Sequence, residues 1–140
     1  MLDPFQAAIR SAAHGLTAQS TRMRVVAENL ANAQSTGPTP GSDPYQRKLL
    51  TFGTVMDSET GTGLVSPDGV SRDSAPFRME YKPGHPAADE RGYVKLPNVD
   101  ILIETADMRE ASRSYAANLQ VIKQAREMVS LTLDLLKVSS

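Results

Sequence analysis

Apolar side chains recur every seven residues at both ends of the chain, and this repeat constrains the fold more than any other feature. Near the N-terminus, one such row is joined by a second row that lies three residues further on. The residues expected to form this seam are Leu2, Phe5, Ile9, Leu16, Met23, Val26 and Leu30. Alternating spacings of three and four are typical of helices that pack as a coiled coil. With Asp3 as its cap and Pro4 in its first turn, the segment predicts a long helix that ends before Gly37.

The helical period returns at about residue 99 and continues to the end of the sequence without a proline or glycine. Its seam comprises Met108, Tyr115, Asn118, Ile122, Val129 and Leu136. Both apolar stripes are too narrow for a solitary core helix, so each helix needs a partner from this chain or from another. Two amides interrupt the seams. Asn118 either fixes the register of the pairing or is solvated where the seam turns outward, whereas for Gln19 we favour the solvated position.

Residues 35–98 differ in composition from the two helical ends of the chain, because they contain eight of the nine prolines and eight of the nine glycines. Short apolar runs at residues 49–52 and 77–81 predict brief strands, and Asp68-Gly69 predicts a hairpin turn. We therefore expect a mainly α fold, in which two long helices pair as a coiled coil around a small, irregular β-containing module. The expected divisions are an N-terminal helix at 1–34, the central module at 35–98 and a C-terminal helix at 99–140.

Charge and composition exclude several classes of function. Fifteen Lys and Arg residues are scattered among sixteen Asp and Glu residues, which gives a formal net charge of −1. Binding to nucleic acid or to a membrane surface needs a clustered basic face, so neither is expected. No apolar run approaches the roughly 18 residues that a transmembrane segment needs. The first residues lack the basic and apolar regions of a cleaved secretory signal, so none is expected.

Few side chains have the spacing that catalysis or metal binding requires. His85 lies near Asp89 and Glu90, but metal sites usually need three or more converging ligands, and a proline-rich polar turn is the simpler interpretation. Residues 61–63 contain only the beginning of a dinucleotide fingerprint, without a βαβ context. We therefore expect no catalytic, cofactor-binding or metal-binding residue and no small-molecule substrate. The chain is not expected to be an enzyme.

Arginines and glutamates lie close together along the expected C-terminal helix, at Arg109, Arg113, Arg126, Glu104, Glu110 and Glu127. They form either salt bridges between subunits or an ordinary solvated helix face. Exposed ion pairs contribute only about 0–1 kcal/mol, so the solvated face is favoured unless assembly buries the charges.

Three short motifs resemble those of bacterial flagellar rod and hook proteins. The first, within residues 18–33, comprises Glu28, Asn29, Leu30, Ala31 and Asn32. The second is similar to the family's Pro-Tyr-x-Arg-Lys element and comprises Pro44, Tyr45, Arg47 and Lys48. The third leads into the last helix and comprises His85, Pro86, Asp89, Gly92, Tyr93, Pro97 and Asn98. This third motif separates the chain from hook and distal-rod proteins, whose middle domains are much larger, so the resemblance is strongest to the proximal-rod members.

This resemblance implies a structural subunit of the basal-body rod, the drive shaft that transmits motor torque toward the hook. It also implies export through the flagellar type III apparatus without signal cleavage, and helical assembly in the periplasmic space with copies of itself and other rod proteins. The two helices would then belong to a coiled-coil tube. An alternative that rests on the seams alone is a soluble helical-hairpin adaptor that dimerises by coiled coil in the cytoplasm. Residues 54–78 match none of these motifs, so their fold is not predicted.

Overall fold

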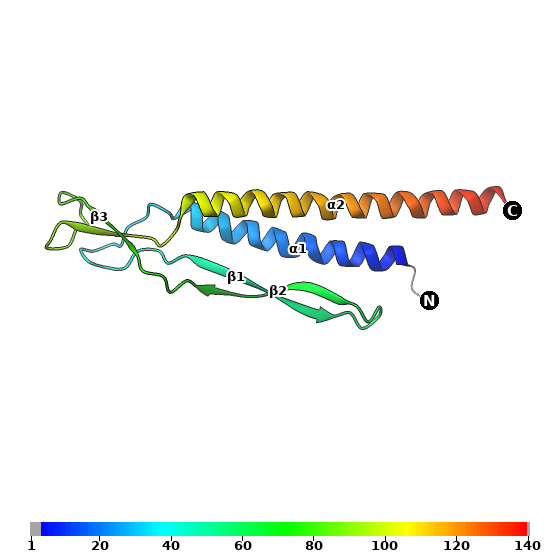
Figure 1. Ribbon diagram of the computed structural model, residues 1–140, viewed down its shortest axis with the longest axis horizontal. Coiled ribbons are helices and arrows are strands. Elements are labelled where there is room, and N and C mark those ends of the chain that lie inside the picture. Colours follow the sequence, from blue (N-terminus) through cyan, green and yellow to red (C-terminus); the bar gives the residue numbers. More distant parts are fainter. Residues whose placement is uncertain (1–3, 140) are drawn as a thin grey trace. The chain divides into compact units, whose positions relative to one another are not determined.

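The computed structural model describes residues 4–139 and has a long helix at each end of that range (Figure 1). In chain order the elements are helix α1 (Pro4–Ala31), strands β1 (Lys48–Met56), β2 (Gly63–Arg72), β3 (Arg78–Tyr81) and β4 (Tyr93–Leu96), and helix α2 (Ile101–Val138). This order confirms the predicted mainly α fold with a β-containing module between two long helices. The predicted cap Asp3 and the seam residue Leu2 lie outside the described residues.

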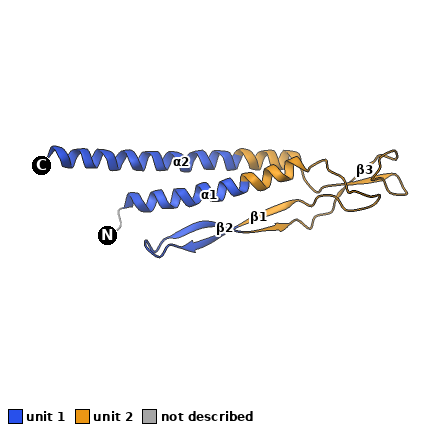
Figure 2. Cartoon of the chain, turned by 180° about the vertical axis from the view of Figure 1, so that it is seen from behind, with its two compact units in different colours: residues 1–22, 52–68, 110–140 blue, residues 23–51, 69–109 orange. Residues whose placement is uncertain are grey.

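Contacts divide the described chain into two compact units, which Figure 2 shows in different colours. Unit 1 contains residues 4–22, 52–68 and 110–139, and unit 2 contains residues 23–51 and 69–109. Each unit therefore holds a segment of both helices and a segment of the paired strands β1 and β2. Among the described residues, no helix combines the length and apolarity that crossing a membrane requires.

Small residues line the contact between α1 and α2 in unit 1. Ala12, Gly15 and Ala18 of α1 are buried, and so are Ala111 and Ala125 of α2. The α1 residues are three apart and the two α2 alanines are fourteen apart, about four helical turns, so each set lies along one face of its helix. With side chains this short, the two helix backbones can approach closely, and dispersion contacts accumulate along the line of approach.

Gly15 and Asn118 meet within this contact. A Cβ atom at position 15 would lie 2.6 Å from Asn118 Nδ2, so glycine leaves the room that the amide occupies. Arg22 Nη2 lies 3.4 Å from Glu110 Oε2; since α1 residues 15 and 22 meet α2 residues 118 and 110, the helices run antiparallel in unit 1. Gln19 follows Ala18 on the buried face, and its Oε1 is buried without a hydrogen-bond partner among the described residues. The predicted solvation of Gln19 is therefore wrong for this oxygen.

The large apolar residues of the predicted seams lie mostly half-buried within residues 4–139. Val26 is buried, and Leu136 keeps 61% of its surface exposed. The partly buried members are Phe5, Ile9, Leu16, Met23, Leu30, Met108, Tyr115, Asn118, Ile122 and Val129. Within unit 1, the most buried residues of each helix are thus the small ones, and the large seam residues are less buried.

Strands β1 and β2 pair through a turn at residues 57–62, not at Asp68-Gly69 as predicted. The turn forms here because Asp57 Oδ1 accepts from the Glu59 amide at 3.0 Å, and because Gly61 supplies the left-handed conformation at φ +65. Residues 68 and 69 lie inside β2 instead. The predicted strands at 49–52 and 77–81 are confirmed within β1 and β3, whereas β2 and β4 were not predicted.

Strands β3 and β4 form a short antiparallel sheet in unit 2, with Arg78 opposite Leu96 and Tyr81 opposite Tyr93. The two tyrosine rings pack edge to face, with centroids 5.3 Å apart. Alternate residues of β4 are buried, so this small sheet contributes apolar surface to the core of unit 2. Residues 97–100 then lead directly from β4 into α2.

Candidate functional site

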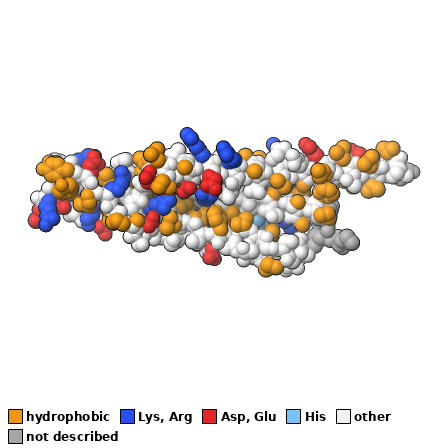
Figure 3. All heavy atoms as spheres, in the orientation of Figure 1, with side chains coloured by type: hydrophobic (Ala, Val, Ile, Leu, Met, Phe, Trp, Pro, Cys, Tyr) orange, Lys and Arg blue, Asp and Glu red, His pale blue; other side chains and the backbone are white. Residues whose placement is uncertain are grey.

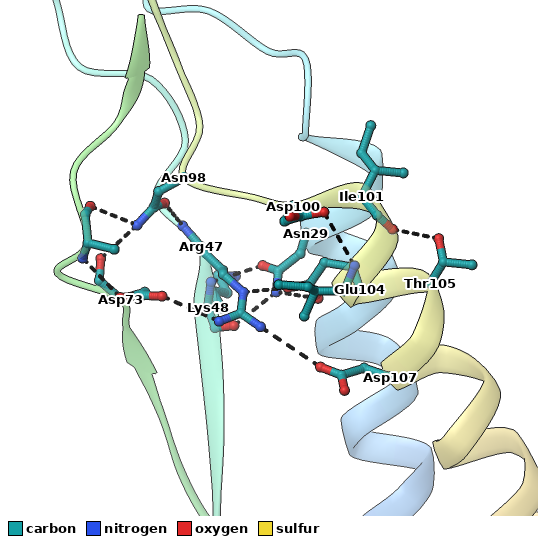
Figure 4. A network of polar contacts seen from close by, with 12 residues as sticks. Asn29, Arg47, Lys48, Asp73, Asn98, Asp100, Ile101, Glu104, Thr105 and Asp107 are labelled. Carbon is teal, nitrogen blue, oxygen red and sulfur yellow. Dashed lines mark hydrogen bonds and ion pairs between the residues drawn. The ribbon is translucent and has the colours of Figure 1, made fainter.

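A network of paired polar side chains joins α1, α2, β1 and the segment that follows β2 in unit 2 (Figure 4). We call this network the polar junction. Its residues are Glu28, Asn29, Tyr45, Arg47, Lys48, Asp73, Asn98, Asp100, Glu104 and Asp107. They come from four separated stretches of sequence and converge at the C-terminal end of α1 and the N-terminal end of α2.

Asn29 lies at the centre of the junction and is only 1% exposed. Its Nδ2 donates to the Lys48 carbonyl at 2.9 Å and to Glu104 Oε2 at 3.1 Å. Its Oδ1 accepts from the Lys48 amide at 2.9 Å and from the Tyr45 hydroxyl at 2.8 Å. The side-chain amide therefore uses both donors and both lone pairs, and it pairs with the backbone of β1 as a neighbouring strand would.

Glu104 is equally buried, and two partners share its charge. Arg47 Nε donates to Glu104 Oε1, while Asn29 donates to the other carboxylate oxygen. A buried carboxylate is costly unless it is paired and hydrogen-bonded, and here both conditions are met. The residue stands in the first turn of α2, where a negative charge also interacts favourably with the helix dipole.

The guanidinium of Arg47 is surrounded by three carboxylates. Besides Glu104, it faces Asp73 Oδ2 at 3.3 Å and Asp107 Oδ2 at 3.9 Å. Burial of Arg47 lowers its pKa, but the hydrogen bonds and charges of Glu104 and Asp73 together outweigh burial, so the pKa of Arg47 is raised. Arg47 thus stays charged, and it ties the residue before β1 both to α2 and to the segment after β2.

Backbone contacts extend the junction into the loops. The amide of Arg47 donates to Asn98 Oδ1 at 2.7 Å, and Asn98 Nδ2 donates to the carbonyls of Asp73 and Ala75 at 3.1 and 3.0 Å. Asp100 caps α2, because its Oδ1 accepts from the Leu102 amide at 2.9 Å. The start of α2 is therefore anchored at the same place where β1 begins.

An ion pair closes the outer side of the junction. Lys48 Nζ lies 2.7 Å from Glu28 Oε2, and Arg24 Nη1 lies 3.1 Å from Glu28 Oε1. The hydrogen bond from Lys48 is the main cause that lowers the pKa of Glu28. Burial has the opposite effect on Tyr45, since removal from water raises the pKa of its hydroxyl.

Two models of known families match the chain, and they cover the two helices. "Flagella basal body rod protein" matches residues 9–39, and "Flagellar basal body rod FlgEFG protein C-terminal" matches residues 90–135. "Flagellar basal-body rod protein FlgC" of Agrobacterium fabrum is 56% identical over 138 residues, or 99% of each chain. The proteins of the same name from Escherichia coli O6:H1 and Aquifex aeolicus are 44% and 37% identical and align with 89% and 96% of this chain, covering 92% and 98% of their own length.

The chain belongs to the FlgC family of flagellar basal-body rod proteins. The resemblance to flagellar rod proteins is thereby confirmed, and the relatives match both helices and the strands between them. No described group of three or more His, Cys, Asp or Glu side chains is arranged to hold a metal ion.

The polar junction brings together the first two FlgC motifs and the end of the third. The motif residues within it are Glu28, Asn29, Tyr45, Arg47, Lys48 and Asn98. Of the others near it, Asn32 Nδ2 donates to the Glu28 carbonyl at 2.8 Å at the end of α1. Leu30 and Pro44 are partly buried, Ala31 is exposed, and no hydrogen bond places these three in the network.

Four residues of the third motif, His85, Pro86, Asp89 and Gly92, lie in the turn between β3 and β4, whereas Tyr93 begins β4 and Pro97 follows it. Asp89 Oδ1 accepts from the amides of Arg91 and Tyr93 at 2.9 Å each, and His85 Nδ1 accepts from the Ala87 amide at 3.0 Å. Gly92 has φ +83, and a Cβ there would lie 2.9 Å from the ring of Tyr81. These residues therefore shape a polar turn, as the simpler interpretation of His85 predicts. Of the two prolines in the motif, Pro86 is exposed and Pro97 is buried.

A smaller polar contact holds the β1–β2 turn to α1 in unit 1. Arg10 Nη1 lies 3.2 Å from Asp57 Oδ2, and Arg10 Nη2 pairs with Glu59. Asp57 also accepts from the amide of Glu59 and from the Thr60 hydroxyl. These hydrogen bonds, with the amide of Glu59 first, lower the pKa of Asp57.

Sequence reasoning missed Glu104, Asp73 and Arg10 as paired residues. Glu104 was assigned to a solvated helix face, which is wrong because Arg47 and Asn29 bury it. Glu110 pairs within the chain with Arg22. Acidic residues are common in the first turn of a helix, where they interact with the helix dipole, so nothing in the sequence distinguished Glu104 from an exposed acid.

Proposed function

We propose that this chain is a structural subunit of the flagellar basal-body rod, not an enzyme, and that it assembles helically with copies of itself and with other rod proteins. The rod then transmits motor torque toward the hook. The observation that carries this proposal is the relationship to FlgC proteins over almost the whole chain. In this proposal the family motifs have a mechanical task, because their polar atoms pair with one another and with the backbone.

Torque transmission requires a subunit that does not yield between its helices and its strands. The polar junction provides this stiffness in unit 2, since Asn29, Arg47 and Glu104 each bond to two or more segments. Opening the junction would leave a carboxylate and a guanidinium without partners away from water, which is costly. We infer that the junction passes load from β1 to both helices.

The seam residues form the contacts between subunits in this proposal. Neighbouring subunits cover the exposed Leu136 and the half-buried seam residues, and the helices pack as a coiled-coil tube; these half-buried residues are Phe5, Ile9, Leu16, Met23, Tyr115, Ile122 and Val129. Burying such side chains stabilises an assembly by about 25 cal/mol per Å² of apolar surface. Export through the type III apparatus without a cleaved signal, and residence in the periplasmic part of the basal body, complete the proposal.

Deletion of the gene followed by complementation tests this function. Loss of swimming, basal bodies without a complete rod, and recovery of both by the unmodified gene are expected. Complementation with Arg47→Glu should fail, whereas Arg24→Glu, an exposed position beside the junction, should restore swimming. Retained motility with intact rods in the deletion strain would contradict the proposal.

A further inference from the structure

An open apolar groove lies between the start of α1 and the C-terminal part of α2 in unit 1. Its volume is about 240 Å³, and its lining residues are Phe5 of α1 and Val129, Thr132, Leu133 and Leu136 of α2. Leu133 and Leu136 keep 52% and 61% of their surface exposed. Figure 3 shows apolar side chains gathered at this end of α2. Unit 1 therefore presents an apolar hollow beside the beginning of α1.

The one polar residue of the lining does not make the groove polar. Thr132 Oγ1 donates to the Met128 carbonyl at 2.8 Å, so its hydroxyl proton is engaged within α2. The methyl group of Thr132 remains as contact surface beside the leucines. An apolar cavity of about 150 Å³ holds a group as large as benzene. The groove thus has room for one aliphatic side chain.

The antiparallel register places the groove level with the residues that precede α1. Position 15 of α1 meets position 118 of α2, and position 22 meets position 110. Residues before Phe5 therefore lie level with α2 residues that follow Val129. Thr132 and Leu136 follow Val129 by three and seven residues, which is about 5 and 11 Å along the helix. Since α1 begins at Pro4, the groove extends past the start of this helix.

Leu2 has the position and the chemistry to enter the groove. It precedes Phe5 by three residues and Ile9 by seven, so the heptad row that contains Phe5 continues through it. Three residues span about 5 Å in a helix and at most about 11 Å in an extended chain. With either backbone, Leu2 reaches the level of residues 132–136. Its neighbours suit the groove less well, because Asp3 is charged and Met1 is one residue further away.

We propose that the side chain of Leu2 fills this groove in the unassembled chain and anchors the segment before α1 to α2. Docking removes apolar surface of Leu2, Leu133 and Leu136 from water, which is favourable. The short connection to α1 gives Leu2 a high effective concentration at the groove, whereas a second copy would lose translational freedom on binding there. Leu2 occupies the space between the lining side chains, and their outer surfaces remain available to neighbouring subunits. The inference concerns the monomer and does not depend on the proposed function.

Disulfide exchange tests this contact, because the chain has no cysteine of its own. Leu2→Cys with Leu133→Cys places one thiol at the docking residue and the other in the groove. Leu2→Cys with Leu131→Cys is the matched control, since position 131 is exposed and lies about 200° around α2 from position 133. In a glutathione buffer with dilute protein, the effective concentration for the intrachain disulfide should be at least about tenfold higher in the first pair. Equal values would overturn the proposal, and a disulfide between two chains in its place would assign the groove to a second copy.

Alkylation of a single thiol measures the cover independently. In the Leu133→Cys variant, the further change Leu2→Ser should raise the rate of reaction with iodoacetamide severalfold, because the groove is then open to the reagent. Gln6→Ser, at an exposed position in the first turn of α1 and outside the groove, should leave the rate unchanged. Circular dichroism checks that every variant keeps the helices of the parent. A rate that Leu2→Ser does not alter would contradict the docking, while the complementation result in cells would stand unaffected.

Discussion

The two compact units hold the same pair of helices by different means. In unit 2 the contact is polar and closed, because Asn29 and Glu104 are buried and all of their hydrogen-bonding atoms in the junction have partners. In unit 1 small residues bring the helices together, and large apolar side chains stay exposed along α2. The difference indicates that the chain completes unit 2 by itself, whereas unit 1 is built to gain further partners.

Removing the guanidinium at the junction should have the largest effect on folding. Arg47→Ala leaves Glu104 charged and buried beside a single amide, and it frees Asp73 and Asp107 from their shared cation. A loss of about 3 kcal/mol in the free energy of unfolding is expected, as for other broken buried ion pairs. Urea unfolding followed by circular dichroism measures this value.

The control for this prediction is the exposed pair of Arg24 and Glu28. Arg24→Ala should change the free energy of unfolding by less than about 1 kcal/mol. Equal effects of Arg24→Ala and Arg47→Ala would show that the junction has no special stability, and the contrast between the units would fail.

A methyl group in the helix contact of unit 1 should have a moderate effect. Gly15→Ala places a Cβ against Asn118, and overpacking of this kind costs about 1–3 kcal/mol, offset by up to about 1 kcal/mol of helix propensity. Asn118→Ala in the same chain should restore most of the loss, because the shorter side chain removes the clash. A double-mutant cycle of thermal unfolding measures this coupling, and independent effects of the two changes would contradict the close approach.

Lowering the pH should reduce the free energy of unfolding least of these changes, and it should weaken contacts in both units. The lowered pKa values of Asp57 and Glu28 mean that each carboxylate contributes stability that is fully present above the ordinary carboxyl pKa of about 4. That contribution is lost as the pH falls through the lowered values of the folded chain. Urea midpoints at pH 3 and pH 6 test the direction; Asp57→Asn should reduce the pH dependence, and an unchanged dependence in that variant would contradict this assignment.

Helical periodicity predicted both long helices because their stripes extend over many turns, so local irregularities did not obscure the pattern. The turn was misplaced at residues 68 and 69 because an Asp-Gly pair is also compatible with an extended strand. The actual turn is six residues long, and Asp57 and Gly61 stabilise it through a side-chain hydrogen bond and a left-handed backbone conformation. The family motifs identified six junction residues but not their purpose. Glu104 could not be found, since its burial depends on Arg47, which lies far away in the sequence.

Hydrogen exchange of the dilute monomer, resolved along the chain, tests the contrast between the units most directly. The prediction is strong protection of amides in residues 23–31 and 101–109, where the polar junction holds the helices. Weaker protection is expected in residues 5–22 and 110–136, where neighbours are still absent, with an increase there on assembly. Strong and equal protection along both helices of the monomer would contradict the account, because unit 1 would then be complete without a partner.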